Sequence, residues 1–205
     1  MARAILDDHV FINCPFDDQY QPLFNAIVFT VHDAGFVARC AREVGDAAQN
    51  RMEKILSIVG ECRYGIHDIS RTELNAKRLP RFNMPLELGA FLGCKRFGGK
   101  RHSSKTALIL DREAYRYQQF ISDIAGQDID AHGSDPERAV QAVRQWLRTE
   151  SRRNNVPGGA VIWQRFQEFQ VALPTILANL HVGLAEMAFV DYTYAITEWL
   201  RANPL

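Results

Sequence analysis

Short apolar runs alternate with amphipathic segments through the first two-thirds of the chain. The apolar runs are typical of buried strands and occupy residues 10–13, 36–40, 64–69 and 106–111, with a weaker run near 128–129. Between them, apolar residues recur at helical spacing over residues 22–31, 52–59, 84–94, 117–124 and 136–147. This alternation predicts an α/β fold in which a roughly five-stranded parallel sheet is covered by helices on both faces.

Four polar residues lie at or next to the ends of the four clearest apolar runs: Asn13, Arg39, Asp68 and Asp111. In open parallel sheets, ligands bind in the crevice outside the carboxyl ends of the strands. Asp68 could therefore hydrogen-bond ribose hydroxyls or donate a proton, although an Asx turn or a loop cap explains it equally well. Its neighbour His67 should face the opposite side of the sheet, so we interpret His67 as a packing residue.

Glu87 is a carboxylate near the start of an otherwise apolar predicted helix, in the sequence Met84-Pro85-Leu86-Glu87-Leu88-Gly89. A carboxylate of this kind can attack an anomeric carbon or stabilise the oxocarbenium-like state that forms as a base leaves. The alternative is a solvated first-turn acid that is stabilised by the helix dipole. We expect Glu87 to be the catalytic residue, with Asp68 beside it.

Four further residues are candidates for binding a substrate, beside Asn13 at the end of the first run. Residues 14–20 contain no glycine, so a pyrophosphate would need Arg39, Arg81 or a helix N-terminus instead. Phe16 could stack on a base, although aromatic residues are more often part of a core. Asn83 could orient the substrate or cap the helix predicted from Met84.

The last quarter of the chain is predicted to be helical and strongly apolar. A polar stretch over residues 149–159 separates it from the alternating region. We therefore expect a sheet domain over residues 1–150 and a helical extension over 151–205. Helices this apolar must be buried against the sheet domain, against each other or in an interface with a second copy.

The chain has 24 Lys and Arg against 24 Asp and Glu, so its formal net charge is zero. This balance argues against direct nucleic-acid binding and leaves little repulsion to oppose self-association. The four cysteines lack metal-ligand and redox spacings, and no metal site is expected. Because no signal peptide or membrane-length apolar run is present, we expect a cytoplasmic protein that does not contact a membrane.

Three sequence features together resemble the nucleoside 2-deoxyribosyltransferase-like superfamily and the neighbouring TIR-like domains of bacterial antiviral systems. They are the run 10–13, Asp68, and the segment 84–89 with its Glu-Leu-Gly. Both families have a flavodoxin-like three-layer fold and a glutamate on the helix after the third strand. The resemblance covers about two-thirds of the chain and implies that Glu87 is the catalytic carboxylate.

The resemblance also implies a reaction. The deoxyribosyltransferases usually carry an acid six residues before the glutamate, within an Asp-Ser-Gly-Thr-like run; here Arg81 holds that position and Asn83 replaces the glycine. Cleavage of an N-ribosyl bond in NAD, a nucleotide or a nucleoside therefore fits better than base exchange, with no cofactor required. Two alternatives are synthesis of a signalling nucleotide from NAD and a non-catalytic nucleotide-binding module. Relatives of this kind self-assemble and act in antiviral defence, which implies a homo-oligomer and a possible partner protein of a defence system.

Overall fold

The computed structural model describes residues 6–43, 45–46, 48–72 and 81–205. Its centre is a five-stranded sheet in the order β2-β1-β3-β4-β5, and every neighbouring pair of strands is parallel. The strands are β1 (Leu6–Asn13), β2 (Val37–Arg39), β3 (Cys62–Asp68), β4 (Thr106–Asp111) and β5 (Ile129–Ala131). This is the flavodoxin-like strand order, so the predicted fold class is confirmed.

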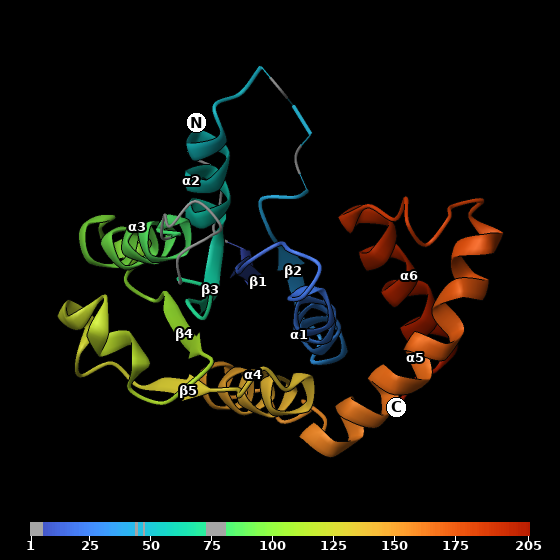
Figure 1. Cartoon of the computed structure of the whole chain (residues 1–205). Coiled ribbons are helices and arrows are strands. Elements are labelled where there is room, and N and C mark those ends of the chain that lie inside the picture. The colour runs from blue at the N-terminus through green and yellow to red at the C-terminus, as the bar shows by residue number, and fades with distance from the viewer. Residues whose placement is uncertain (1–5, 44, 47, 73–80) are drawn as a thin grey trace.

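Helices cover both faces of the sheet (Figure 1). α1 (Gln21–Asp33) and α4 (Pro136–Ser151) pack together on one face, and α2 (Arg51–Glu61) and α3 (Asn83–Phe97) pack together on the other. Side-chain caps fix the start of two of them: Asn50 accepts from the Met52 amide at α2, and Asp135 accepts from the Glu137 amide at α4. Each of these helices begins near the edge of the sheet where the strands end.

The alternation of side chains along β3 separates the two cores. Tyr64 and Ile66 join the core under α1 and α4, whereas His67 packs edge-to-face on Phe91 of α3. Gly65 leaves room for this second packing, because a Cβ atom there would lie 2.7 Å from His67 Nε2 and 2.8 Å from the Phe91 ring. The period of the strand thus sends His67 and Asp68 to opposite faces.

The structure differs from the predicted elements in the segment after β4. Residues 117–124 were expected to form one helix, but they form two short 3-10 turns, η2 (Arg116–Gln119) and η3 (Ser122–Ile124). A left-handed Tyr115 (φ 63°) precedes η2, and Arg116 is tied back to Asp111 at the end of β4. These constraints hold the segment against the sheet edge over too short a span for a regular helix. A further short turn, η1 (Lys100–His102), precedes β4.

The C-terminal region forms two helices, α5 (Gly159–Asn179) and α6 (Phe189–Ala202), which pack outside α1 and α4 (Figure 1). Pro174 does not split α5, which continues through it as one helix. Phe29 of α1 stacks on Phe169 with a centroid separation of 5.2 Å and lies 5.7 Å from the Trp199 ring. The extension therefore shares its core with the sheet region, while the domain boundary near residue 150 stays a prediction.

One buried ion pair fastens the extension to α1. Arg165 of α5 lies 3.0 Å from the Asp33 carboxylate and also donates to the backbone oxygen of Asn203. Its guanidinium sits over the Trp199 ring. In the part of the chain that the structure describes, no helix is long and apolar enough to cross a membrane.

Candidate functional site

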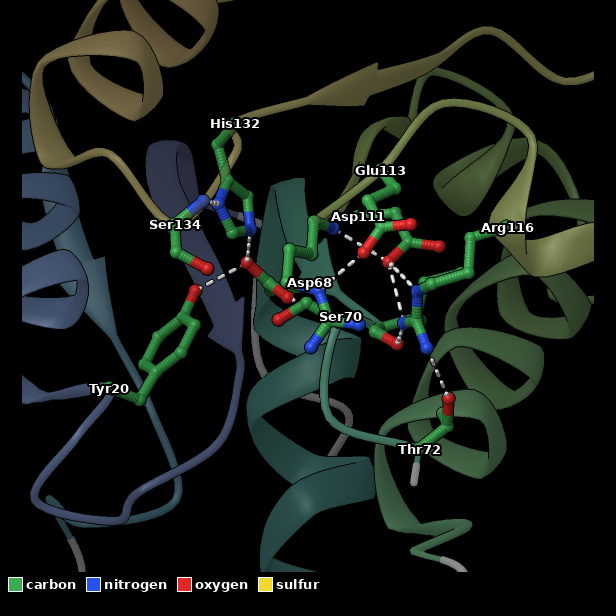
Figure 2. A network of polar contacts seen from close by, with 11 residues as sticks. Tyr20, Asp68, Ser70, Thr72, Asp111, Glu113, Arg116, His132 and Ser134 are labelled. Atoms are coloured by element: carbon green, nitrogen blue, oxygen red, sulfur yellow. Dashed lines mark hydrogen bonds and ion pairs between the residues drawn. The ribbon is translucent and has the colours of Figure 1, made fainter.

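Asp68 ends β3 in a fully buried hydrogen-bonded cluster (Figure 2). Its Oδ1 accepts from the Ser70 amide at 2.8 Å, and its Oδ2 accepts from the Tyr20 hydroxyl at 2.5 Å. His132 Nε2 lies 2.9 Å from the same Oδ2. Because His132 Nδ1 accepts from the Ser134 amide, the neutral ring carries its proton on Nε2, facing Asp68. Both carboxylate oxygens are thus committed to three separate segments of the chain.

Asp111 ends the neighbouring strand β4 in a second buried ion pair (Figure 2). Arg116 lies 2.6 Å from its Oδ1, and the guanidinium also donates to the Ile69 oxygen and the Thr72 hydroxyl. Burial raises the pKa of Asp111, whereas Arg116 opposes that rise. This pair holds the loop after β3 against the turn after β4, so its role in the fold is to fix these two segments at the carboxyl edge of the sheet.

Asn13 joins the end of β1 to the start of α3. Its buried amide nitrogen donates to the Met84 carbonyl oxygen at 2.8 Å and lies 3.1 Å from His67 Nδ1. Burial, with a smaller effect of Lys105, lowers the pKa of His67 to about 3, so this ring stays neutral. Asn13 is therefore placed to position α3 and has no free amide hydrogen for a substrate.

Glu87 faces inward because of its place in the helical period. Met84, Leu88 and Phe91 form the buried stripe of α3, and Glu87 lies three residues after Met84 on the same side. The residue is only 8% exposed. Within the described residues, no group forms a hydrogen bond or ion pair with its carboxylate, so Glu87 is a buried acid with a free hydrogen-bonding capacity.

A pocket of about 260 Å³ opens next to this carboxylate, between the first turns of α2 and α3. We call it the Glu87 pocket; its lining residues are Asn50, Arg51, Met52, Ile55, Asn83, Leu86 and Glu87. Its volume is near the lower end of the range for small-molecule sites. Both helices begin at the edge where the strands end, which is where open α/β sheets bind ligands.

The lining of the Glu87 pocket holds one acidic side chain, Glu87, and one cationic side chain, Arg51. Burial raises the pKa of Glu87 to about 7, and the Arg51 guanidinium opposes that rise. The carboxyl can therefore be protonated or ionised near neutral pH. An arriving cation would favour the ionised form and an arriving anion the protonated one. Arg51 is exposed and makes no hydrogen bond or ion pair among the described residues, which leaves it available to an anionic group.

The two predicted catalytic carboxylates do not share this pocket. Asp68 is absent from its lining and bonds to Tyr20 and His132, which precede α1 and α4 on the other face of the sheet. Cys14 is buried and is influenced by both acids: burial raises the pKa of its thiol well above the ordinary value, and the charges of Asp68 and Glu87 add to that rise. The thiol is thus held protonated.

Two of the predicted binding residues have other partners. Arg39 is half-buried and pairs with Glu43 at 2.5 Å and with Glu61 at 3.2 Å, away from the Glu87 pocket. Phe16 packs edge-to-face on Phe24, and the Arg42 guanidinium lies over its ring. Neither side chain lines the Glu87 pocket.

Arg81 and Asn83 lie at or near the pocket. Arg81 donates to Asp17, which also pairs with Arg71, so the loop after β1 is tied to the segment before α3. Asn83 is exposed and lines the pocket one turn before Glu87. It does not cap α3, because the helix begins at Asn83 itself, and Phe82 at the cap position makes no side-chain cap bond.

Sequence reasoning missed the second wall of the pocket and the partners of Asp68. Asn50 and Arg51 precede an apolar helical period, and the capping preference of asparagine was the available signal for that wall. His132 comes directly after β5, but β5 has only three residues and gives a weak strand pattern.

Comparisons with protein-family models, with curated proteins and with solved structures give no match for this chain. Among the described residues, no group of three or more His, Cys, Asp or Glu side chains could hold a metal ion. Among the described residues, the Glu87 pocket is therefore the feature from which we infer a function.

Proposed function

We propose that the protein hydrolyses an N-ribosyl bond in a nucleotide such as NAD, with Glu87 acting at C1′ of the ribose. The observation that carries the proposal is a buried carboxylate without a hydrogen-bond partner among the described residues, facing a pocket at the carboxyl edge of a parallel sheet. The resemblance of the segment 84–89 to ribosyl-cleaving families supports the same assignment.

The chemistry of the pocket favours a cationic leaving group. Glu87 is the one acid among the described lining residues, and Asp68 is enclosed elsewhere. A neutral purine leaves readily only after it is protonated, whereas the pyridinium of NAD departs as neutral nicotinamide without a general acid. Burial raises the pKa of Glu87 to about 7, and the positive charge of a bound pyridinium would favour the ionised form of this carboxyl.

The proposed reaction is the hydrolysis of the C1′–N bond, with water as the second reactant. The C1′–N bond breaks and its electron pair leaves with nicotinamide, while the Glu87 carboxylate stabilises the cationic C1′ or bonds to it. Water then supplies the oxygen that bonds to C1′, displaces the Glu87 carboxylate where that has bonded, and releases one proton to solvent. Arg51 would bind a phosphate of the substrate, and the exposed Asn83 would contact the ribose.

The direct test incubates the protein with NAD and separately with adenosine, and follows the released base by chromatography. We expect nicotinamide release that falls about a hundredfold or more in Glu87→Gln. Glu53→Gln, which removes an exposed carboxylate from the first turn of α2, is the matched control and should keep the activity. Equal release by wild type and Glu87→Gln would refute the proposed site.

The products separate the proposal from its alternatives. Linear ADP-ribose with nicotinamide indicates hydrolysis, while a cyclised or base-exchanged product indicates synthesis of a signalling nucleotide at the same site. If NAD raises the melting temperature of the wild type but releases no base, the protein is a nucleotide-binding module. A specific activity, the rate per amount of protein, that rises with protein concentration would support the predicted self-assembly, and a defence partner would then be sought with the assembled form.

A further inference from the structure

A second pocket, of about 310 Å³, lies between the start of α1 and the segment that leads into α6. We call it the Arg42 pocket. Polar side chains from the sheet region line one side of it, namely Asp18, Gln21, Asn25 and Arg42, and residues 184–192 line the other. It shares no lining residue with the Glu87 pocket, so a ligand there would be additional to the proposed substrate.

A chain of hydrogen bonds fixes which groups face this pocket. Arg42 Nη1 donates to Gln21 Oε1 at 3.5 Å, and Gln21 Nε2 donates to Asn25 Oδ1 at 2.7 Å. A guanidinium can only donate, so the orientation of both amides follows from it. The Asn25 amide nitrogen makes no bond to any described residue. It is left as a free donor in the lining that also holds the exposed Arg42 guanidinium, and two such donors favour an acceptor such as a carboxylate.

Arg42 is held in place for such a contact. Its Nη2 donates to the Phe16 carbonyl oxygen at 2.9 Å, and its guanidinium lies 4.6 Å from the centroid of the Phe16 ring. These contacts limit the conformations of a long side chain, so binding an anion costs less rotamer entropy than at a free surface arginine.

The remaining lining adds a negative charge and an apolar wall. Asp18 is exposed and has no ion-pair partner among the described residues, Arg42 included. Leu184 is exposed and Met187 is half-buried, and these two side chains give the pocket an apolar wall, whereas Phe24 and Phe189 are almost fully buried with ring centroids 5.9 Å apart. A ligand that satisfies the whole pocket must therefore carry an acid for Arg42, a cationic donor for Asp18 and an apolar body for the apolar wall.

We propose that the Arg42 pocket binds a free α-amino acid with an apolar side chain. The α-carboxylate pairs with Arg42 and Asn25, the ammonium group pairs with Asp18, and the side chain packs on Leu184 and Met187. A phosphosugar fits less well, because it would place extra negative charge near Asp18 and hydroxyl groups on the apolar wall. The ligand would bridge the sheet region and the C-terminal extension.

Isothermal titration calorimetry of the full chain with leucine, methionine and phenylalanine tests the proposal. We expect at least one of them to bind, and Arg42→Met to weaken that binding about tenfold or more, since a charge-assisted hydrogen bond is lost. Arg201→Met removes an exposed arginine of α6 that pairs only with Glu198 among the described residues, and it should leave binding unchanged. Circular dichroism establishes that each variant is folded.

Two analogues of the bound amino acid test the pairing of each charge. The amide analogue, which lacks the carboxylate, should bind the wild type about as weakly as the amino acid binds Arg42→Met. The N-acetyl analogue, which lacks the ammonium group, should bind wild type and Asp18→Asn equally. The proposal is overturned if no amino acid binds at millimolar concentration, if the amide analogue binds as tightly as the amino acid, or if ribose 5-phosphate binds in their place.

Discussion

The Tyr20 hydroxyl donates to Asp68 Oδ2 over 2.5 Å, and this bond joins the residue before α1 to the end of β3. Both side chains are buried, and His132 approaches the same oxygen. An acid so enclosed holds loops together. We therefore regard Asp68 as a positioning residue for the edge of the sheet where the Glu87 pocket opens.

Removal of the Tyr20 hydroxyl should destabilise the fold. In Tyr20→Phe, Asp68 loses one of its donors, and we expect the free energy of unfolding to fall by about 1–3 kcal/mol. Urea denaturation measures the change. Tyr194→Phe, which alters an exposed tyrosine of α6, is the control and should stay within about 0.5 kcal/mol of the wild type. Equal losses in the two variants would show that the Tyr20–Asp68 bond adds nothing.

Glu87 should make stability depend on pH in a defined window. Its folded-state pKa is raised from 4.5 to about 7 by burial, so between these values the folded state holds a proton that the unfolded chain has released. Stability then falls as pH rises, by about 1.4 kcal/mol per pH unit and about 3 kcal/mol in total. Glu87→Gln cannot ionise, so its stability relative to wild type should increase between pH 4.5 and 7. A constant difference across that range would contradict the raised pKa.

Arg51 should lower the pKa of Glu87. The guanidinium opposes the effect of burial, so Arg51→Gln is expected to raise the Glu87 pKa above its wild-type value. Carbon-13 NMR of the labelled glutamate carboxyls measures this titration directly, and Glu87→Gln identifies the signal. Lys54→Gln, which replaces a half-buried cation of the same helix that does not contribute to the Glu87 pKa, is the control. A lower pKa in Arg51→Gln would exclude the proposed electrostatics.

Arg165 should be essential for the attachment of the C-terminal helices. Arg165→Met leaves the Asp33 carboxylate buried without its cation, and we expect a loss of about 3 kcal/mol at neutral pH. The double variant Asp33→Asn/Arg165→Met removes the orphaned charge and should recover about 1 kcal/mol or more. Burial already raises the pKa of Asp33 against the effect of Arg165, so the defect of the single variant should shrink at acidic pH. Strictly additive losses in the double variant would show that the pair is not coupled.

The strand framework was predictable because local patterns determine it. Apolar runs long enough for one strand each carry Asn13, Arg39, Asp68 and Asp111 at or next to their ends, and these four residues are the last residues of β1 to β4. The same pattern sends His67 and Asp68 to opposite faces. The prediction of one helix over residues 117–124 was wrong because Arg116 is held by distant groups, the Ile69 oxygen and the Thr72 hydroxyl, as well as by Asp111, and no local spacing encodes these contacts.

The candidate site was only partly predictable, for a related reason. The position of Glu87 among apolar residues indicates burial, but the pocket beside it depends on how α2 packs against α3, which no local spacing encodes. Two partners of Asp68 are distant in the sequence: Tyr20 lies 48 residues before it and His132 lies 64 residues after it. Arg39 was misleading because Glu43 and Glu61, which neutralise it, come together only in the folded state.

The contact between Phe29 and Trp199 has a consequence for synthesis on the ribosome. Phe29 lies in the first helix and is fully buried by residues of α5 and α6, which are translated long after it. Until those helices appear, the outer side of α1 remains uncovered in the nascent protein. The sheet region therefore emerges with an exposed apolar surface on α1. The later helices α5 and α6 must cover this surface before another chain binds to it.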